Sequence, residues 1–116
     1  MLKKEIIKNF SINQNQLYLI EEYLCILENH NSHTNLVGKS TLENPWTSHI
    51  LDSLQLLSHI KNKENSILDM GTGAGFPGIV LKICGCSNIT LVDSNGKKIN
   101  FLKHVNLKLN LGLNIV

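Results

Sequence analysis

The sequence of 116 residues contains no arginine, so all 11 of its basic residues are lysines. A guanidinium is the side chain best suited to clamp a phosphate or carboxylate with two parallel hydrogen bonds. No such clamp and no arginine finger can therefore operate from this chain. The formal net charge of +2 also excludes a strongly basic nucleic-acid arm and an acidic tail, although it permits a modest RNA contact.

Long apolar runs are missing as well. No segment reaches the roughly 18 consecutive apolar residues that a membrane-spanning helix needs. Lysine and glutamate interrupt the first ten residues, so we expect no secretory signal and no membrane partner. The three cysteines are odd in number, which favours free thiols and a cytoplasmic protein.

Two motifs carry a weak suggestion of metal chemistry. Cys84 and Cys86 are separated by one residue, not by the two that are usual in metal or redox pairs, so we expect buried free thiols. His30 and His33 lie in a polar stretch, where they are more typical of surface residues than of ligands. We therefore expect no metal site.

Helical spacing dominates residues 1–62, which we predict to be an N-terminal helical segment. Ser11 is followed three residues later by Gln14, the form of a capping box at a helix start. Pro45 precedes a second helical pattern. The apolar residues at helical spacing are Leu17, Ile20, Leu24 and Leu27, and then Trp46, Ile50, Leu54 and Leu57.

Residues 63–116 have a different pattern. The apolar run 66–70 stops at a cluster of glycines and predicts a buried strand. Pro77 suits the first position of a helix. Residues 88–92 predict a second strand, 97–110 a helix and 113–116 the start of a third strand. Alternating strands and helices predict a parallel α/β sheet.

The stretch from Ile67 to Leu81 reads ILDMGTGAGFPGIVL. Gly71, Gly73 and Gly75 follow the predicted strand, and glycine permits a sharp turn and a close approach of a ligand. Ligands of open parallel sheets bind beyond the carboxyl ends of the strands. This loop is therefore the candidate binding site.

Asp69, which lies just before the glycines, restricts the kinds of ligand that the loop can bind. A shifted dinucleotide fingerprint survives at Gly73, Gly75 and Gly78, but it leaves Gly71 unexplained and sets a carboxylate beside a pyrophosphate. S-adenosylmethionine carries a sulfonium and an ammonium, which tolerate the aspartate. The P-loop pattern is absent.

A second acidic residue, Asp93, ends the second predicted strand 18 residues after Gly75. A carboxylate at this spacing can accept both hydroxyls of a ribose. The alternative is that Asp93 only caps a turn with Ser94 and Asn95. The glycine loop at the expected distance favours the ribose.

Four motifs, in this order and spacing over roughly residues 15–116, resemble the bacterial guanine-N7 methyltransferases of small-subunit ribosomal RNA, also called glucose-inhibited division protein B. The glycine loop is generic to class I methyltransferases, and the segment that begins at His49 is more specific. The motifs are Thr34-Asn35-Leu36, His49-Ile50-Leu51-Asp52-Ser53, Asp69 to Gly78, and Val92-Asp93-Ser94 followed by Gly96-Lys97.

The resemblance implies a class I, Rossmann-like fold and methyl transfer from S-adenosylmethionine to N7 of a guanine in small-subunit ribosomal RNA. Gly71 and Phe76 match cofactor positions of the family, and Asp93 matches its ribose acid. The resemblance implies no catalytic residue. The residues that match family positions near the active cleft, and are expected near the substrate, are Asn35, His49 and Lys97.

Simpler structural interpretations remain open for His49 and Lys97. His49 and Asp52 are three residues apart and can pair on a helix surface. Lys97, with Lys98, His104 and Lys108, can contact phosphate or can form a solvated helix face.

The chain also departs from the family, because family members are longer and this sequence stops as the third strand begins. Residues 63–116 are thus expected to form an incomplete methyltransferase core, with its first strand as an exposed edge. We expect a fragment or truncated product that is inactive alone. The other hypotheses are a nicotinamide-dinucleotide-binding oxidoreductase fragment, and a non-catalytic remnant or partner-binding module.

Overall fold

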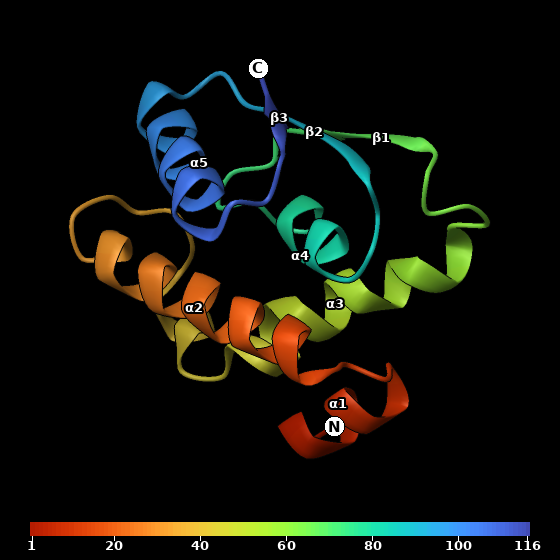
Figure 1. Ribbon diagram of the computed structural model, residues 1–116. Coiled ribbons are helices and arrows are strands. Elements are labelled where there is room, and N and C mark those ends of the chain that lie inside the picture. Colours follow the sequence, from red (N-terminus) through yellow and green to blue (C-terminus); the bar gives the residue numbers. More distant parts are fainter.

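A computed structural model describes all 116 residues and shows helices gathered on one side of a small sheet (Figure 1). The predicted order, helices first and then alternating strands and helices, is confirmed. The helices are α1 (Lys3–Asn9), α2 (Gln14–Asn31), α3 (Leu51–Gln55), α4 (Gly78–Ile83) and α5 (Gly96–Leu109), and the strands are β1 (Ser66–Met70), β2 (Asn88–Val92) and β3 (Asn114–Ile115). Short 3-10 turns cover Lys39–Leu42 and Leu56–His59, and a π-helical turn covers Trp46–Ile50.

The sheet is parallel, with the strand order β1-β2-β3. Leu68 pairs with Thr90, which in turn pairs with Asn114 of the short third strand. β1 is therefore an edge strand, as predicted, with one side of its backbone unpaired. Parallel strands joined through helices α4 and α5 form a Rossmann-like α/β arrangement.

The two faces of the sheet differ in cover. Ile89 and Leu91 of β2 are fully buried on the face that packs against α4. On the opposite face, Leu68 and Met70 of β1 are 58% and 73% exposed. The prediction of a buried first strand is wrong, because the helices lie on one side and leave this face open (Figure 1).

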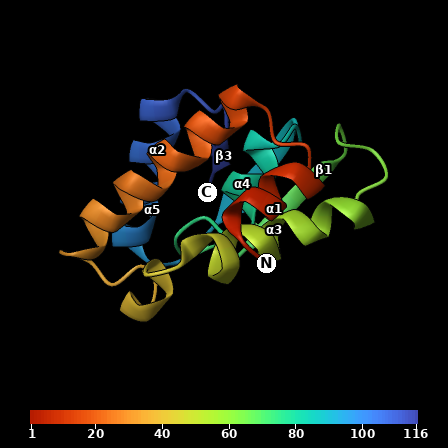
Figure 2. The same ribbon diagram turned by 90° about the horizontal axis from the view of Figure 1, so that it is seen from below.

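One hydrophobic core runs through both parts of the sequence and contains 25 buried residues. Helix α2 supplies its predicted stripe of Ile20, Leu24 and Leu27 and packs against α4 and α5. α2 lies alongside α5 also when the molecule is seen from below (Figure 2). The boundary at residue 62 stays a prediction about folding units, since the core spans it.

The start of α2 differs from the predicted one. The reciprocal capping pair is Asn13 and Gln16, whose side chains accept from each other's backbone N–H at 2.8 and 3.0 Å. Ser11 has φ 52° and belongs to the turn between α1 and α2. The prediction was wrong because Ser11 and Asn13 each stand three residues before a glutamine, and the structure uses the second of these pairs. None of the helices combines the length and apolarity needed to cross a membrane.

Candidate ligand site at the glycine loop

The glycine loop joins β1 to α4 at the carboxyl end of the sheet. Gly71, Gly73 and Gly75 have φ values of 68°, 59° and 100°, a region that residues with a Cβ rarely adopt. The backbone N–H groups of Gly71 and Thr72 both donate to the carbonyl oxygen of Val92, at 2.8 and 3.1 Å. The loop is therefore fixed to the end of the neighbouring strand, where ligands of such sheets bind.

The glycines serve two different purposes. A Cβ added at Gly71 or Gly73 would meet nothing within 4 Å. A Cβ at Gly75 would lie 2.3 Å from Ile79 Cδ1, and one at Gly78 would lie 2.3 Å from Leu91 Cδ2. The first two glycines border open space that a ligand can enter, whereas the last two permit close packing of α4.

Asp69 fastens the loop from inside. Its Oδ2 accepts hydrogen bonds from the hydroxyl of Thr72 at 2.7 Å and from the backbone N–H of Gly78 at 3.0 Å. The carboxylate therefore lies at the start of α4, the position at which an anion is favoured. In a dinucleotide site the pyrophosphate occupies this position. Here the protein has filled it with its own negative charge.

Asp93 lies on the other side of the loop. Its Oδ2 accepts from the backbone N–H of Gly73 and its Oδ1 from that of Asn95, each at 2.9 Å. These hydrogen bonds lower the pKa of the Asp93 carboxyl, that of Asn95 most. The side chain thus forms the expected turn and also joins the loop. A carboxylate has about four lone-pair sites, so acceptor capacity remains for a ligand.

Aromatic side chains hold the loop from the helical segment. The rings of Phe76 and His49 are stacked, with centroids 4.5 Å apart and an interplanar angle of 9°. Tyr23 of α2 contacts Phe76 at 5.3 Å and donates its hydroxyl hydrogen to the carbonyl oxygen of Ala74 at 2.5 Å. Burial and the nearby charge of Asp69 raise the pKa of Tyr23. The loop is consequently positioned by a helix that precedes it by many residues.

His49 does not form the surface pair with Asp52 that its spacing allowed. The only ion pair in the structure joins Lys3 and Glu21. The Nε2 atom of His49 lies 2.8 Å from the hydroxyl of Thr41 instead. Burial lowers the pKa of His49, and the charge of Asp52 opposes that shift.

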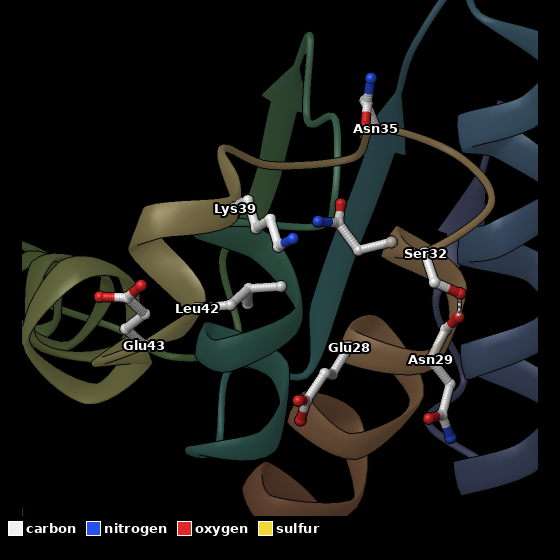
Figure 3. Close-up of a pocket in the computed structure, with 8 residues that line it drawn as sticks. Glu28, Asn29, Ser32, Asn35, Lys39, Leu42 and Glu43 are labelled. Atoms are coloured by element: carbon white, nitrogen blue, oxygen red, sulfur yellow. Dashed lines mark hydrogen bonds between the residues drawn. The ribbon is translucent and has the colours of Figure 1, made fainter.

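The three residues expected near the substrate line separate hollows. His49 and Phe76 border a small hollow of about 200 Å³. Asn35 lies at a polar hollow of about 780 Å³ between the end of α2 and the turn at Lys39–Leu42, and its side chain points outward at the rim (Figure 3). Lys97 lines a third hollow, of about 360 Å³, together with Thr34. The largest hollow is thus not the one at the glycine loop.

The cysteines are free thiols. Cys84 and Cys86 are buried, as predicted, and Cys25 is exposed. Burial raises the pKa of Cys84 to about 11 and also raises that of Cys86. No group of three or more His, Cys, Asp or Glu side chains is placed to hold a metal ion.

Sequence reasoning missed the residues that shape the site from a distance. Tyr23 carried a signal, because it lies next to Leu24 on the apolar stripe of α2 and has a hydroxyl that needs a partner when buried. Thr72 lies between Gly71 and Gly73, and its position in the sequence did not indicate that its hydroxyl would donate to Asp69. Asn31 is a third case, since its Oδ1 accepts from the backbone N–H groups of Leu36 and Val37 at 2.8 and 3.1 Å and so shapes the loop that carries Asn35.

Comparison with known proteins adds an independent finding. Residues 16–116 match the sequence model of the family described as rRNA small subunit methyltransferase G. A protein named ribosomal RNA small subunit methyltransferase G from Orientia tsutsugamushi (strain Ikeda) is 43% identical over 97 residues, covering 84% of this chain and 49% of the relative.

Proteins of the same name from other bacteria give similar values. The one from Rhodospirillum rubrum is 48% identical over 83 residues, which cover 72% of this chain and 41% of the relative. The one from Mycoplasma capricolum is 45% identical over 105 residues, which cover 90% and 46%. The chain spans about half the length of these curated relatives. It belongs to the rRNA small subunit methyltransferase G family.

Proposed function

We propose that this chain carries the cofactor-binding part of a cytoplasmic enzyme that transfers a methyl group from S-adenosylmethionine to N7 of a guanine in small-subunit ribosomal RNA. Family membership supports the reaction class. The observation that carries the choice of cofactor is the position of Asp69, whose carboxylate caps the start of α4. A pyrophosphate placed there would meet a fixed negative charge, whereas a sulfonium or ammonium would be attracted to it.

The loop fits such a cofactor in shape as well as in charge. Gly71 and Gly73 border open space, and Asp93 lies beside Gly73 with its carboxylate ionised. In this proposal, Asp93 accepts the ribose hydroxyls and the backbone at Gly71 faces the methionine part. Phe76, held by His49 and Tyr23, keeps the loop in this shape.

When bound, S-adenosylmethionine supplies an electrophilic methyl group on a positively charged sulfur. Guanine N7 has a lone pair and no proton, so its alkylation requires no general base. The contribution of the chain's own residues is then orientation and electrostatics. Asn35, His49 and Lys97 are proposed to lie on the side from which the RNA approaches, with no proton transfer assigned to any of them.

Calorimetric titration of the 116-residue chain with S-adenosylmethionine tests the cofactor. We expect saturable binding that Asp93→Ala abolishes. Glu64→Ala is the matched control, because Glu64 is an exposed carboxylate in the turn at the opposite end of β1. Circular dichroism of each variant checks that the chain is folded.

Two outcomes would contradict the proposal. Binding of NADH in place of S-adenosylmethionine would favour the dinucleotide alternative. Absence of binding by a folded chain would show that the loop and Asp93 do not form a sufficient site, and would favour a non-catalytic remnant or partner-binding module.

A further inference from the structure

A hollow of about 360 Å³ lies beside the contact between the end of α2 and α5, apart from the glycine loop. α5 lies above α2 in Figure 1 and next to it in Figure 2, and the two helices are in contact. The polar lining of this hollow comes from three elements, namely the end of α2, the loop that follows it and residues 97–104 of α5. These polar residues are His30, Thr34, Lys97, Asn100 and His104.

Two imidazoles form one wall of this hollow. The rings of His30 and His104 have centroids 5.0 Å apart, and the buried ring of Phe101 meets His30 edge-on at 5.4 Å. Nδ1 of His30 lies 3.1 Å from the carbonyl oxygen of Ile26, so this nitrogen carries hydrogen and donates. The other ring nitrogen of His30 and both of those of His104 have no hydrogen-bond partner within the protein.

The hollow carries basic groups, and Asp93, the acidic residue just before α5, interacts with Lys98 outside it. None of its lining residues is acidic, and Lys97 has no ion pair. The whole of α5, fourteen residues, contains four lysines and one histidine but no aspartate or glutamate. A carboxylate one turn away would pair with such a lysine, and α5 contains none. The last acidic residue of α2, Glu28, lines the neighbouring hollow and not this one.

We infer that this hollow is a subsite for a backbone phosphate of the RNA strand. A lysine, two imidazoles, a hydroxyl and an amide line a space whose lining contains no acidic residue. These are the donor types that contact phosphate oxygens in nucleic-acid complexes. The identity of the anion as RNA rests on the proposed function, whereas the presence of an anion site does not.

The subsite lies next to Asn35. Thr34 lines this hollow, and the next residue, Asn35, lies at the rim of the large polar hollow of Figure 3. A phosphate held by Lys97 and His104 would therefore place the adjoining nucleotide beside an outward-pointing amide. Amide groups recognise base edges through paired donors and acceptors.

Fluorescence anisotropy with a labelled single-stranded RNA oligonucleotide tests this inference on the full chain. Lys97→Ala and His104→Ala should each weaken binding by about fivefold to tenfold, and Lys97→Ala should reduce the salt slope by about 0.7. Lys108→Ala is the matched control, an exposed lysine of α5 outside the hollow. Both affected side chains are exposed, so these variants are expected to fold.

Three results would overturn the inference. The first is equal RNA affinity for Lys97→Ala and Lys108→Ala, and the second is absence of RNA binding by the unmodified chain. The third is saturation by inorganic phosphate with no added affinity for RNA, which would assign the site to a small phosphate. None of these results depends on S-adenosylmethionine, so failure here and failure of the cofactor titration are distinguishable.

Discussion

The two faces of the three-stranded sheet have similar apolar residues and opposite environments. Leu91 of β2 is fully buried beneath α4, whereas Leu68 of β1 is 58% exposed on the opposite face. The covered face carries the glycine loop, because the packing glycines and Asp69 tie α4 to the strands. The candidate site therefore depends on the covered face and owes little to the open one.

The two faces are expected to differ most in stability when a leucine side chain is truncated to alanine on each of them. Leu91→Ala should lower the free energy of unfolding by about 2–5 kcal/mol, because it leaves a cavity under α4. Leu68→Ala, in the adjacent strand, should change it by no more than about 0.5 kcal/mol. Urea denaturation of both variants measures this. Equal losses would mean that the open face is covered in solution.

A second substitution removes the hydrogen bond that joins α2 to the glycine loop on the covered face. Tyr23→Phe leaves the buried carbonyl of Ala74 without its hydrogen bond and should cost about 1–3 kcal/mol of stability. The pKa of Tyr23 is raised in the folded state, so its contribution is present below the ordinary tyrosine pKa and is lost as the pH rises above it. Thermal melts above pH 10 should fall less steeply for Tyr23→Phe than for the unmodified chain. Parallel slopes would refute a buried, neutral hydroxyl.

Asp93 lies at the rim between the loop and solvent, and a smaller effect is expected there. Its pKa is lowered on folding, so its contribution is present above the ordinary aspartate pKa and is lost as the pH falls through the folded value. Asp93→Asn should flatten the loss of melting temperature below about pH 4. An unchanged acid slope would indicate that Asp93 does not hold Gly73 in solution.

The open face gives the smallest expected change in stability. Leu68→Lys should leave the free energy of unfolding within about 0.5 kcal/mol, because the side chain already faces solvent. It should nevertheless reduce self-association, since a charge on an exposed edge strand blocks pairing with another strand. Sedimentation at increasing concentration, with Lys61→Ala as a surface control, would sharpen the comparison. If Leu68→Lys left self-association unchanged, β1 would not be the strand through which copies of the chain pair.

The sequence predicted well those features that depend on neighbouring residues. Strand β2 matches its predicted range, and Asp93 and the glycine loop meet as the spacing of parallel strands requires. The exposure of β1 was not predictable from its own residues, because an apolar run looks the same whether or not another layer covers it. Whether a glycine permits packing or access, as at Gly78 and Gly71, likewise depends on what lies opposite it.

Part of the site depends on contacts between segments far apart in the chain. Tyr23 reaches Ala74 across 51 residues, and His30 meets His104 across the groove between two helices. No local spacing rule relates such pairs. The separate positions of Asn35, His49 and Lys97 have the same cause, since their hollows are set by how the loop after α2 folds over α5 and the π-helical turn.

The bond between Tyr23 and Ala74 also has a consequence for biosynthesis. Because the ribosome makes the chain from its N-terminus, α2 exists before the loop it holds, and the tyrosine hydroxyl must wait about 3–10 s for 51 further residues. During that interval α2 has neither the loop nor α4 to cover its apolar stripe. A nascent chain that stalls before the glycines would therefore leave this stripe without the part of its cover that the loop and α4 provide.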